Sequence, residues 1–434
     1  MSSAAIELTT LDPGAQEPLD VARRAVAFMS EAQSTLELAL YDVRLPDPMG
    51  SMVREAIEGA AARGVAVRLA YNDEREERDA PLPPPPITER DLIESLKVPT
   101  LGIPGVPDLM HHKYVVRDGR SVWTGSTNWT ADAWSLQENV IAVVDSEAVA
   151  AAYRQNFAEL WDTRQVDRSG FHEPRPADVG GAQVRACFTP GQGKDLSHRI
   201  ANAIGRAGER VRIASPVITA GPILGTLAQE AAEGRLDLAG VVDGPQTAQV
   251  FSQWGANPRS TWKVPLLATV LREAPFSAKP STPYAPGRPH DYMHAKVTVA
   301  DDVVFCGSFN LSRSGELNAE NVLEIHDVDL ADRMAAHVDA IRGRYPEAAA
   351  PEARFLPRRG PVLRVARVAS QGAPQGEAAT QHQRAEQGDE RHQESGEGQL
   401  AGLGGGPRCG RRGLGPGPGL GTRLATRLAL PGVR

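Results

Sequence analysis

Residues 110–128 read MHHKYVVRDGRSVWTGSTN, and residues 293–310 repeat the pattern as MHAKVTVADDVVFCGSFN. In both stretches a His is followed by x-Lys and then by four residues and an Asp, and Gly-Ser-x-Asn ends the stretch. A Glu-Asn-Val lies downstream of each copy at the same distance. A long pattern that occurs twice predicts two structural units of the same kind.

The apolar residues around each copy predict alternating helices and strands. Before the first copy, apolar residues at helical spacing predict helices over residues 21–32 and 52–61, and alternating ones predict strands over 36–40 and 65–69. The same order returns before the second copy, with helices near 200–204 and 223–232 and strands at 211–213 and 236–242. The sequence therefore predicts an α/β protein of two duplicated halves.

Breaks in this pattern predict the domain limits. Pro, Gly and Asp residues interrupt the apolar period between the two copies. The predicted parts are a first half over 1–165, a linker over 166–182, a second half over 183–350 and a tail over 351–434. The tail is rich in Gly, Gln, Pro and Arg and has no sustained period, which predicts disorder.

Two further segments are predicted to be long insertions. Residues 73–108 begin with an acidic cluster and contain a proline run, and residues 244–291 are rich in proline. Loops of that length in a compact domain are usually functional or disordered. Both segments lie beside a copy of the repeated pattern in the sequence, so a wall that contacts acyl chains is one expected role for them.

Charge and composition limit the function classes. The chain has 434 residues and a net charge of −7, but residues 361–434 hold ten Arg and six acidic residues, which leaves −11 for residues 1–360. An acidic folded part disfavours a nucleic-acid groove, although a local field can override net charge. A weaker hypothesis is that Arg residues of the tail contact an anionic surface. Three widely spaced Cys predict no disulfide framework, and the start has no export signal, so we expect a cytoplasmic protein.

The repeated residues have the chemistry of a phosphate site. Two residues that are two apart on a strand project from the same face, so each His and its Lys can reach one bound group. Gly-Ser-x-Asn adds hydroxyl and amide donors at a tight turn, namely Ser126 and Asn128 in the first copy and Ser308 and Asn310 in the second. The chain has only six Lys, and two of them occur in this pattern, which indicates a specific need for a compact ammonium group.

Both copies match the double His-x-Lys-x4-Asp signature of the phospholipase D superfamily, and the chain resembles that family over roughly residues 5–345. The resemblance implies a monomeric pseudo-dimer with one active site between its halves and with neither metal nor cofactor. It implies that His111 attacks phosphorus to form a phosphohistidine, while His294 protonates the leaving oxygen and then activates water. Lys113, Lys296, Asn128 and Asn310 would bind the phosphate.

The resemblance also implies roles for the carboxylates. A carboxylate downstream of each motif would orient the His of the opposite half, which assigns Glu320 to His111 and Glu138 to His294. Asp118 and Asp301 would be structural. His112 departs from the second copy, and strand alternation predicts that it faces away from the site.

Three functions remain open at this stage. The first is hydrolysis of a phospholipid to phosphatidate and an alcohol, with transfer to another alcohol and transient contact with a membrane surface. The second is a nuclease with the same chemistry, and the third is a catalytically silent binding module. A zinc site at His111 and His112 is a rival chemical interpretation, but adjacent strand residues diverge. Tyr41 and Asp42 are expected either to line the cleft or to serve as core and cap.

Overall fold

The computed structural model describes residues 5–73, 90–105, 107–173, 175–282 and 290–350. The helices of the first half are α1 (Pro18–Ser30), α2 (Met49–Ala62), α3 (Arg90–Glu94), α4 (Ala131–Ser135) and α5 (Glu147–Thr163). Its strands are β1 (Ile6–Leu11), β2 (Thr35–Leu40), β3 (Val43–Arg44), β4 (Ala66–Asp73), β5 (Thr100–Pro104), β6 (Lys113–Arg117), β7 (Ser121–Gly125), β8 (Trp129–Thr130) and β9 (Asn139–Asp145). The predicted tail over 351–434 lies outside the described residues.

The second half repeats this order of elements. Its helices are α6 (Gly193–Arg206), α7 (Gly221–Glu233), α8 (Gly244–Ala256), α9 (Val264–Glu273), α10 (Arg313–Leu317) and α11 (Val328–Arg342), with short 3₁₀ turns η1 (Val166–Arg168) and η2 (Thr261–Lys263). Its strands are β10 (Ala177–Val179), β11 (Ala182–Phe188), β12 (Arg210–Ser215), β13 (Asp237–Asp243), β14 (Phe276–Lys279), β15 (Val297–Ala300), β16 (Val303–Gly307) and β17 (Asn321–His326).

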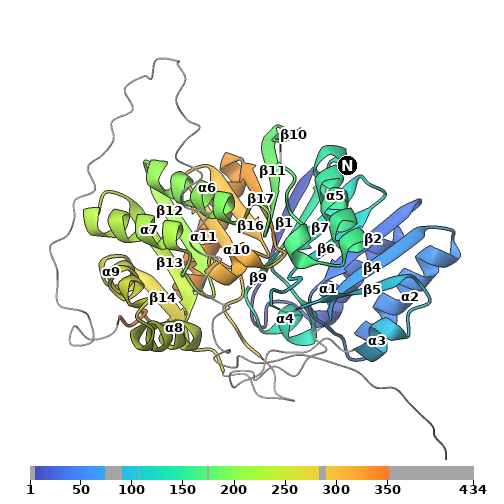
Figure 1. The fold of residues 1–434 in the computed structure, drawn as a ribbon, viewed down its shortest axis with the longest axis horizontal. Coiled ribbons are helices and arrows are strands. Elements are labelled where there is room, and N and C mark those ends of the chain that lie inside the picture. The colour runs from blue at the N-terminus through green and yellow to red at the C-terminus, as the bar shows by residue number, and fades with distance from the viewer. Residues whose placement is uncertain (1–4, 74–89, 106, 174, 283–289, 351–434) are drawn as a thin grey trace, which may run out of the picture. The chain divides into compact units, whose positions relative to one another are not determined.

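The two sheets have the same topology. The first has the strand order β1-β9-β7-β6-β2-β4-β5, and the second has β10-β11-β17-β16-β15-β12-β13-β14. Each strand of the first sheet thus has a counterpart in the second, and β10 is an added edge strand. Figure 1 shows α6 and α7 beside β12 and β13, as the second helix pair of the duplicated pattern. The predicted α/β duplication is confirmed.

Both faces of each sheet are buried, which explains the apolar strands. One core lies between the first sheet and α1 and α2, and another lies between the second sheet and α6, α7 and α9. A third core joins α5, α11 and the remaining faces of both sheets, so the two halves share it. Within it the rings of Tyr153 and Phe188, one from each half, lie 4.9 Å apart. No helix among the described residues is long and apolar enough to cross a membrane.

The structure corrects the prediction for residues 244–291. Most of this segment is α8, α9 and β14, and the prolines do not break these elements. Pro245 and Pro265 lie in the first turns of α8 and α9, where a missing N–H costs no hydrogen bond. Within 73–108, the described residues form α3 and β5, and residues 74–89 lie outside the description. Part of the predicted linker is β10, which pairs with β11.

The motif aspartates hold a tight turn after each motif strand. Asp118 and Asp301 have left-handed φ values of 56° and 51°. The carboxylate of Asp301 accepts hydrogen bonds from the backbone N–H groups of residues 208–210, at 2.7 to 3.0 Å. Asp118 accepts equivalent bonds from residues 33–35. Each carboxylate thereby ties the end of its motif strand to the start of the neighbouring strand, β2 or β12.

We expect Asp301→Asn to lower the free energy of unfolding by about 1–2 kcal/mol at pH 7, because charge-assisted hydrogen bonds of a partly exposed carboxylate are lost. Hydrogen bonds from the backbone lower the pKa of Asp301, against the effect of burial. The stabilisation is therefore complete above the unfolded pKa of about 3.9 and is lost as the pH falls through the folded pKa. Urea unfolding across this pH range should show the wild-type and variant curves converging in acid.

The neighbouring Asp302 provides the control, because it is exposed and its side chain has no hydrogen bond in the described structure. Asp302→Asn should leave the unfolding curve unchanged. Equal stability of the Asp301→Asn variant and the wild type at pH 7 would contradict the structural role.

Candidate active site

Backbone pairing between the halves positions the two motif histidines. Met110 forms a parallel bridge with Ala319, and Met293 forms one with Glu138. The N–H of His111 also donates to the carbonyl oxygen of Ala319 at 2.9 Å. Each histidine follows one of these bridged residues and precedes a motif strand, β6 or β15. The segment that carries the downstream carboxylate of one half thus lies beside the histidine of the other.

His111 contacts the carboxylate that the sequence assigns to it. Its Nδ1 lies 2.7 Å from Glu320 Oε2, and both side chains are buried. Burial lowers the pKa of His111 well below its usual value and raises the pKa of Glu320 to about 8. When Glu320 is ionised, Nδ1 of the neutral imidazole donates to the carboxylate, and Nε2 of His111 then has a free lone pair.

The assignment of Glu138 to His294 is wrong in this structure. Nδ1 of His294 lies 3.0 Å from Oδ1 of Asn139, one residue further along the chain. Glu138 instead accepts a hydrogen bond from Lys279 at 2.8 Å and another from the hydroxyl of Tyr345. The physical reason is the register between the halves. Met110 is bridged to the residue before Glu320, whereas Met293 is bridged to Glu138 itself, so the residue that meets His294 is Asn139.

The two motif lysines are buried with the histidines. Lys113 and Lys296 are 1% and 4% exposed, and each ammonium donates to the carbonyl of the histidine two residues earlier, at 2.6 and 2.7 Å. In the described part of the chain these are their only hydrogen bonds, so each ammonium keeps N–H groups for a ligand. Burial lowers the pKa of Lys113 to about 7, and burial and the charge of Lys113 lower that of Lys296 well below its usual value.

Burial and the same two ammonium groups act on His294. Its pKa is well below the usual value, first because of burial and then because of Lys296 and Lys113. Among the described residues, the site therefore gathers two lysines, two histidines and a single carboxylate in contact with them, Glu320. The charged forms of both lysines are therefore costly until an anion binds beside them.

The Gly-Ser turns support the site from behind. A Cβ on Gly125 would lie 2.0 Å from the carbonyl oxygen of Val140, and the φ of 137° also requires glycine. This close approach places the Ser126 hydroxyl against Asn139 Oδ1, at 2.8 Å, while the N–H of Val140 donates to the same hydroxyl. Ser126 donates its single O–H proton to Asn139 in this structure, and phosphate binding by Ser126 stays a prediction.

The second turn uses its serine in a similar way. Ser308 is fully buried and accepts a hydrogen bond from the N–H of Asn321 at 3.0 Å. Hydrogen bonding by Ser308 also lowers the pKa of Glu320, so the hydroxyl serves the carboxylate rather than a ligand. Asn128 and Asn310 are only half-buried. The Oδ1 of Asn128 has no hydrogen-bond partner among the described residues.

Tyr41 borders the site. Its ring meets His111 edge-on with a centroid distance of 4.5 Å, and the Lys113 ammonium lies 4.7 Å from the centre of the same ring. Asp42 is buried, pairs with Arg44 at 2.9 Å and raises the pKa of Lys113 through its charge. Asp42 thus acts at a distance, whereas Tyr41 lines the site.

His112 lies in the contact between the halves. It is fully buried, and its Nδ1 is 3.2 Å from the side-chain nitrogen of Asn321. Its ring packs against Tyr114 and Phe188. In the described ranges no group of three or more His, Cys, Asp and Glu side chains could hold a metal ion, so the zinc interpretation of His111 and His112 lacks its remaining ligands.

Sequence reasoning missed three site residues. Asn139 belongs to a Glu-Asn-Val that occurs in both halves. This repetition marks Asn139 in the sequence, but it does not show what the side chain contacts. Lys279 and Tyr345 are far from both motifs in the sequence, and no pattern marks them. Only the tertiary structure brings them to Glu138.

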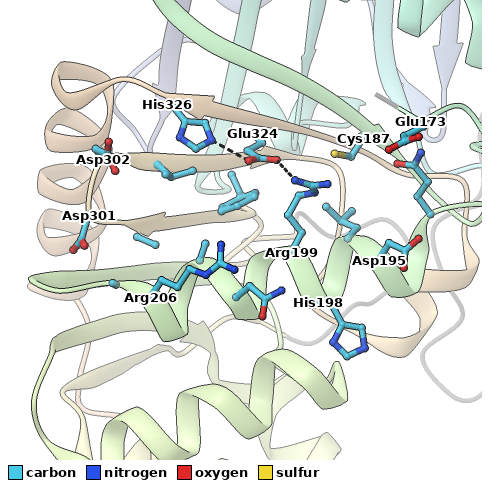
Figure 2. Close-up of a pocket in the computed structure, with 18 of the residues that line it drawn as sticks. Glu173, Cys187, Asp195, His198, Arg199, Arg206, Asp301, Asp302, Glu324 and His326 are labelled. Carbon is cyan, nitrogen blue, oxygen red and sulfur yellow. Dashed lines mark hydrogen bonds and ion pairs between the residues drawn. The ribbon is translucent and has the colours of Figure 1, made fainter. Parts of the chain in front are cut away.

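A separate cavity of about 770 Å³ lies on the second half between α6, β16 and β17. Figure 2 shows Glu324 between two partners that also line the cavity, Arg199 at 3.4 Å and His326 at 2.9 Å. None of the motif histidines and lysines lines it. The cavity is therefore distinct from the histidine site.

Comparisons with known proteins agree with this arrangement. A family model described as "Cardiolipin synthase, PLD-like domain" matches residues 26–161 and 200–342. The mitochondrial cardiolipin hydrolase of Xenopus tropicalis is 30% identical over 147 residues, 32% of this chain and 60% of that protein. A phospholipase D of Rickettsia bellii is 34% identical over 108 residues, 25% of this chain and 49% of that protein.

The fold has a solved counterpart. The structure of a phosphatidylserine synthase of Haemophilus influenzae superposes with a TM-score of 0.54 at 13% identity and covers 79% of this chain and 87% of that one. The matches to the two named relatives cover less than two thirds of each relative's length. The family model, in contrast, matches more than half of this chain and does so once in each half. The chain therefore belongs to the phospholipase D superfamily.

Proposed function

We propose that the chain is a phosphodiesterase that hydrolyses a phospholipid to phosphatidate and an alcohol. The observation that carries the proposal is the burial of Lys113 and Lys296 beside both histidines, with one carboxylate in contact. A phosphodiester anion would supply the missing negative charge and would accept the N–H groups that the lysines keep.

The proposed reaction has two steps. In the first, Nε2 of His111 attacks phosphorus, an N–P bond forms, and the P–O bond to the leaving alcohol breaks while His294 gives that oxygen a proton. In the second, His294 takes a proton from water, the water oxygen attacks phosphorus, and the N–P bond breaks. Glu320 stabilises the positive charge that develops on His111 in each step. An alcohol in place of water would yield a new phosphodiester.

The choice of a phospholipid rests on charge and on the relatives. The net charge of −11 over residues 1–360 opposes a polyanionic strand but not a single phosphodiester. The names of the matching relatives, cardiolipin hydrolase and phospholipase D, support the same class of substrate. A nuclease is the alternative that the test below separates.

We expect mixed micelles of phosphatidylglycerol to yield phosphatidate and glycerol, while single-stranded DNA and RNA remain intact. His111→Ala and His294→Ala should each lower the rate at least about 100-fold, because each removes a group that acts on the reacting atoms. A chelator should leave the rate unchanged, since the lysines supply the charge that a metal would. Lipid and oligonucleotide products can be separated by mass spectrometry.

Thermal melting of each variant provides the folding control for this comparison. Cleavage of nucleic acid without release of phosphatidate would refute the substrate class while leaving the histidine chemistry in place. Absence of turnover on both classes by the folded wild type would refute the enzyme proposal itself.

Anion binding should be coupled to proton uptake. Sulfate stays a dianion near neutral pH, so any protons taken up on binding are bound by groups of the protein. Because burial depresses the pKa of Lys113 to about 7, a bound anion should raise that pKa and draw a proton at pH 7 to 8. Affinity should accordingly fall as the pH rises. Calorimetry in two buffers of different ionisation enthalpy measures the proton number.

Lys113→Met and Lys296→Met should each weaken sulfate binding about tenfold or more, the loss expected for a charged hydrogen-bond donor. Lys97 is exposed and lies outside the site, so Lys97→Met is the matched control and should bind like the wild type. Proton release on binding, or an equal effect of all three variants, would contradict the anion site.

A further inference from the structure

The two halves differ in the residue at the end of their last parallel strand. In the second half the parallel strands β13 and β14 place Asp243 opposite Lys279 in the strand register. In the first half the equivalent strands β4 and β5 place Asp73 opposite Pro104. The second half thus has a lysine where the first half has a proline. This lysine is 3% exposed and lies at the end of β14, next to the segment that carries Glu138.

Lys279 is held by a complete set of acceptors. Its ammonium donates to Glu138 Oε2 at 2.8 Å, to the carbonyl of Leu136 at 3.1 Å and to that of Tyr292 at 3.2 Å. All three of its N–H donors are therefore used inside the protein, and none remains for a ligand. The second oxygen of Glu138 accepts from the Tyr345 hydroxyl, so the carboxylate is held from two sides.

This arrangement leaves the two histidines with unlike partners. His111 has a carboxylate, and His294 has an amide oxygen. The amide is oriented: Ser126 donates to Oδ1 of Asn139, and Nδ2 of Asn139 donates to the carbonyl of Ala133 at 3.1 Å. Because Oδ1 accepts, Nδ1 of His294 must carry a hydrogen.

The difference in partners has a chemical consequence. A carboxylate stabilises an imidazolium more than an amide does, so a protonated His294 gives up its proton more readily than a protonated His111. A strong acid suits the group that protonates a leaving oxygen, and a carboxylate partner suits the group on which positive charge develops during attack.

We propose that Lys279 is a positioning residue that keeps Glu138 away from His294 and thereby makes the two histidines unequal in acid strength. The effect on catalysis rests on the proposed function. The placement of Glu138 by Lys279 does not, because it is a property of the free protein. The titratable groups that act on His294 through their charge are Lys296, Lys113, His111 and Lys279. Lys279 therefore affects the pKa of His294 in two ways, through its own charge and by holding Glu138.

The first test is NMR titration of ¹⁵N-labelled histidine in the free protein, with the His294 signals assigned by their loss in His294→Ala. In Lys279→Met the pKa of His294 should rise by about one unit or more, because a cation is lost and a carboxylate is freed nearby. Lys279→Arg should stay close to the wild type. An unchanged His294 titration in folded Lys279→Met would overturn the proposal.

Glu138→Gln provides a test that does not depend on the folding of Lys279→Met. If Lys279 keeps Glu138 from His294, this variant should leave the His294 titration in place, and the double variant Lys279→Met/Glu138→Gln should show a smaller rise than Lys279→Met alone. A fall of the His294 pKa by one unit in Glu138→Gln would mean that Glu138 is the partner of His294, and would overturn the proposal.

The pH dependence of kcat tests whether Lys279 sets the acid strength of His294 during turnover. In Lys279→Met the limb of the profile that reports the acid should move to higher pH. The rate with a leaving group that needs no proton should change less than the rate with an ordinary alcohol, because the acid step is bypassed. A purely structural role would lower both rates without moving the limb. An NMR shift without any turnover in the wild type would leave the positioning intact and refute the proposed function instead.

Discussion

The burial of two ammonium groups beside two imidazole rings is the constraint on which the rest of the site depends. Like charges inside a protein repel, and the protein lowers that cost by holding Lys113 and Lys296 with depressed pKa values rather than by pairing each with a carboxylate. Neither half completes the cluster by itself. Glu320 reaches His111 only across the contact between the halves.

The same contact explains why the duplicated halves are not equivalent. A difference in backbone register places Asn139 against one histidine and Glu320 against the other. Lys279 and Tyr345 donate hydrogen bonds to Glu138, the carboxylate that an exact two-fold relation between the halves would place beside His294. A nucleophile and an acid have different tasks, and a few contacts on a shared scaffold give the two histidines different partners.

Apolar periodicity was sufficient to predict the α/β class and the helices and strands before each motif, and the repeated motif predicted the duplication. The contact between His111 and Glu320 followed from the family resemblance of that motif. The resemblance failed for Glu138 because the register between the halves is set by tertiary packing, which spacing along one chain does not encode. Residues 244–291 were misjudged for a local reason: proline in the first turn of a helix is as favourable as proline in a loop. The partner of the Ser126 hydroxyl, Asn139, is likewise brought near by the fold alone.

The central claim is that one histidine of the pair carries the phosphoryl group, and the direct test is to locate the covalent adduct. Wild type, His111→Ala and His294→Ala are mixed with a phosphodiester whose leaving group needs no proton, quenched and digested at neutral or alkaline pH for peptide mass spectrometry. The account predicts an adduct on His111 in the wild type, accumulation of that adduct in His294→Ala, and none in His111→Ala. An adduct on His294 in His111→Ala, or no adduct in any of the three proteins, would contradict it.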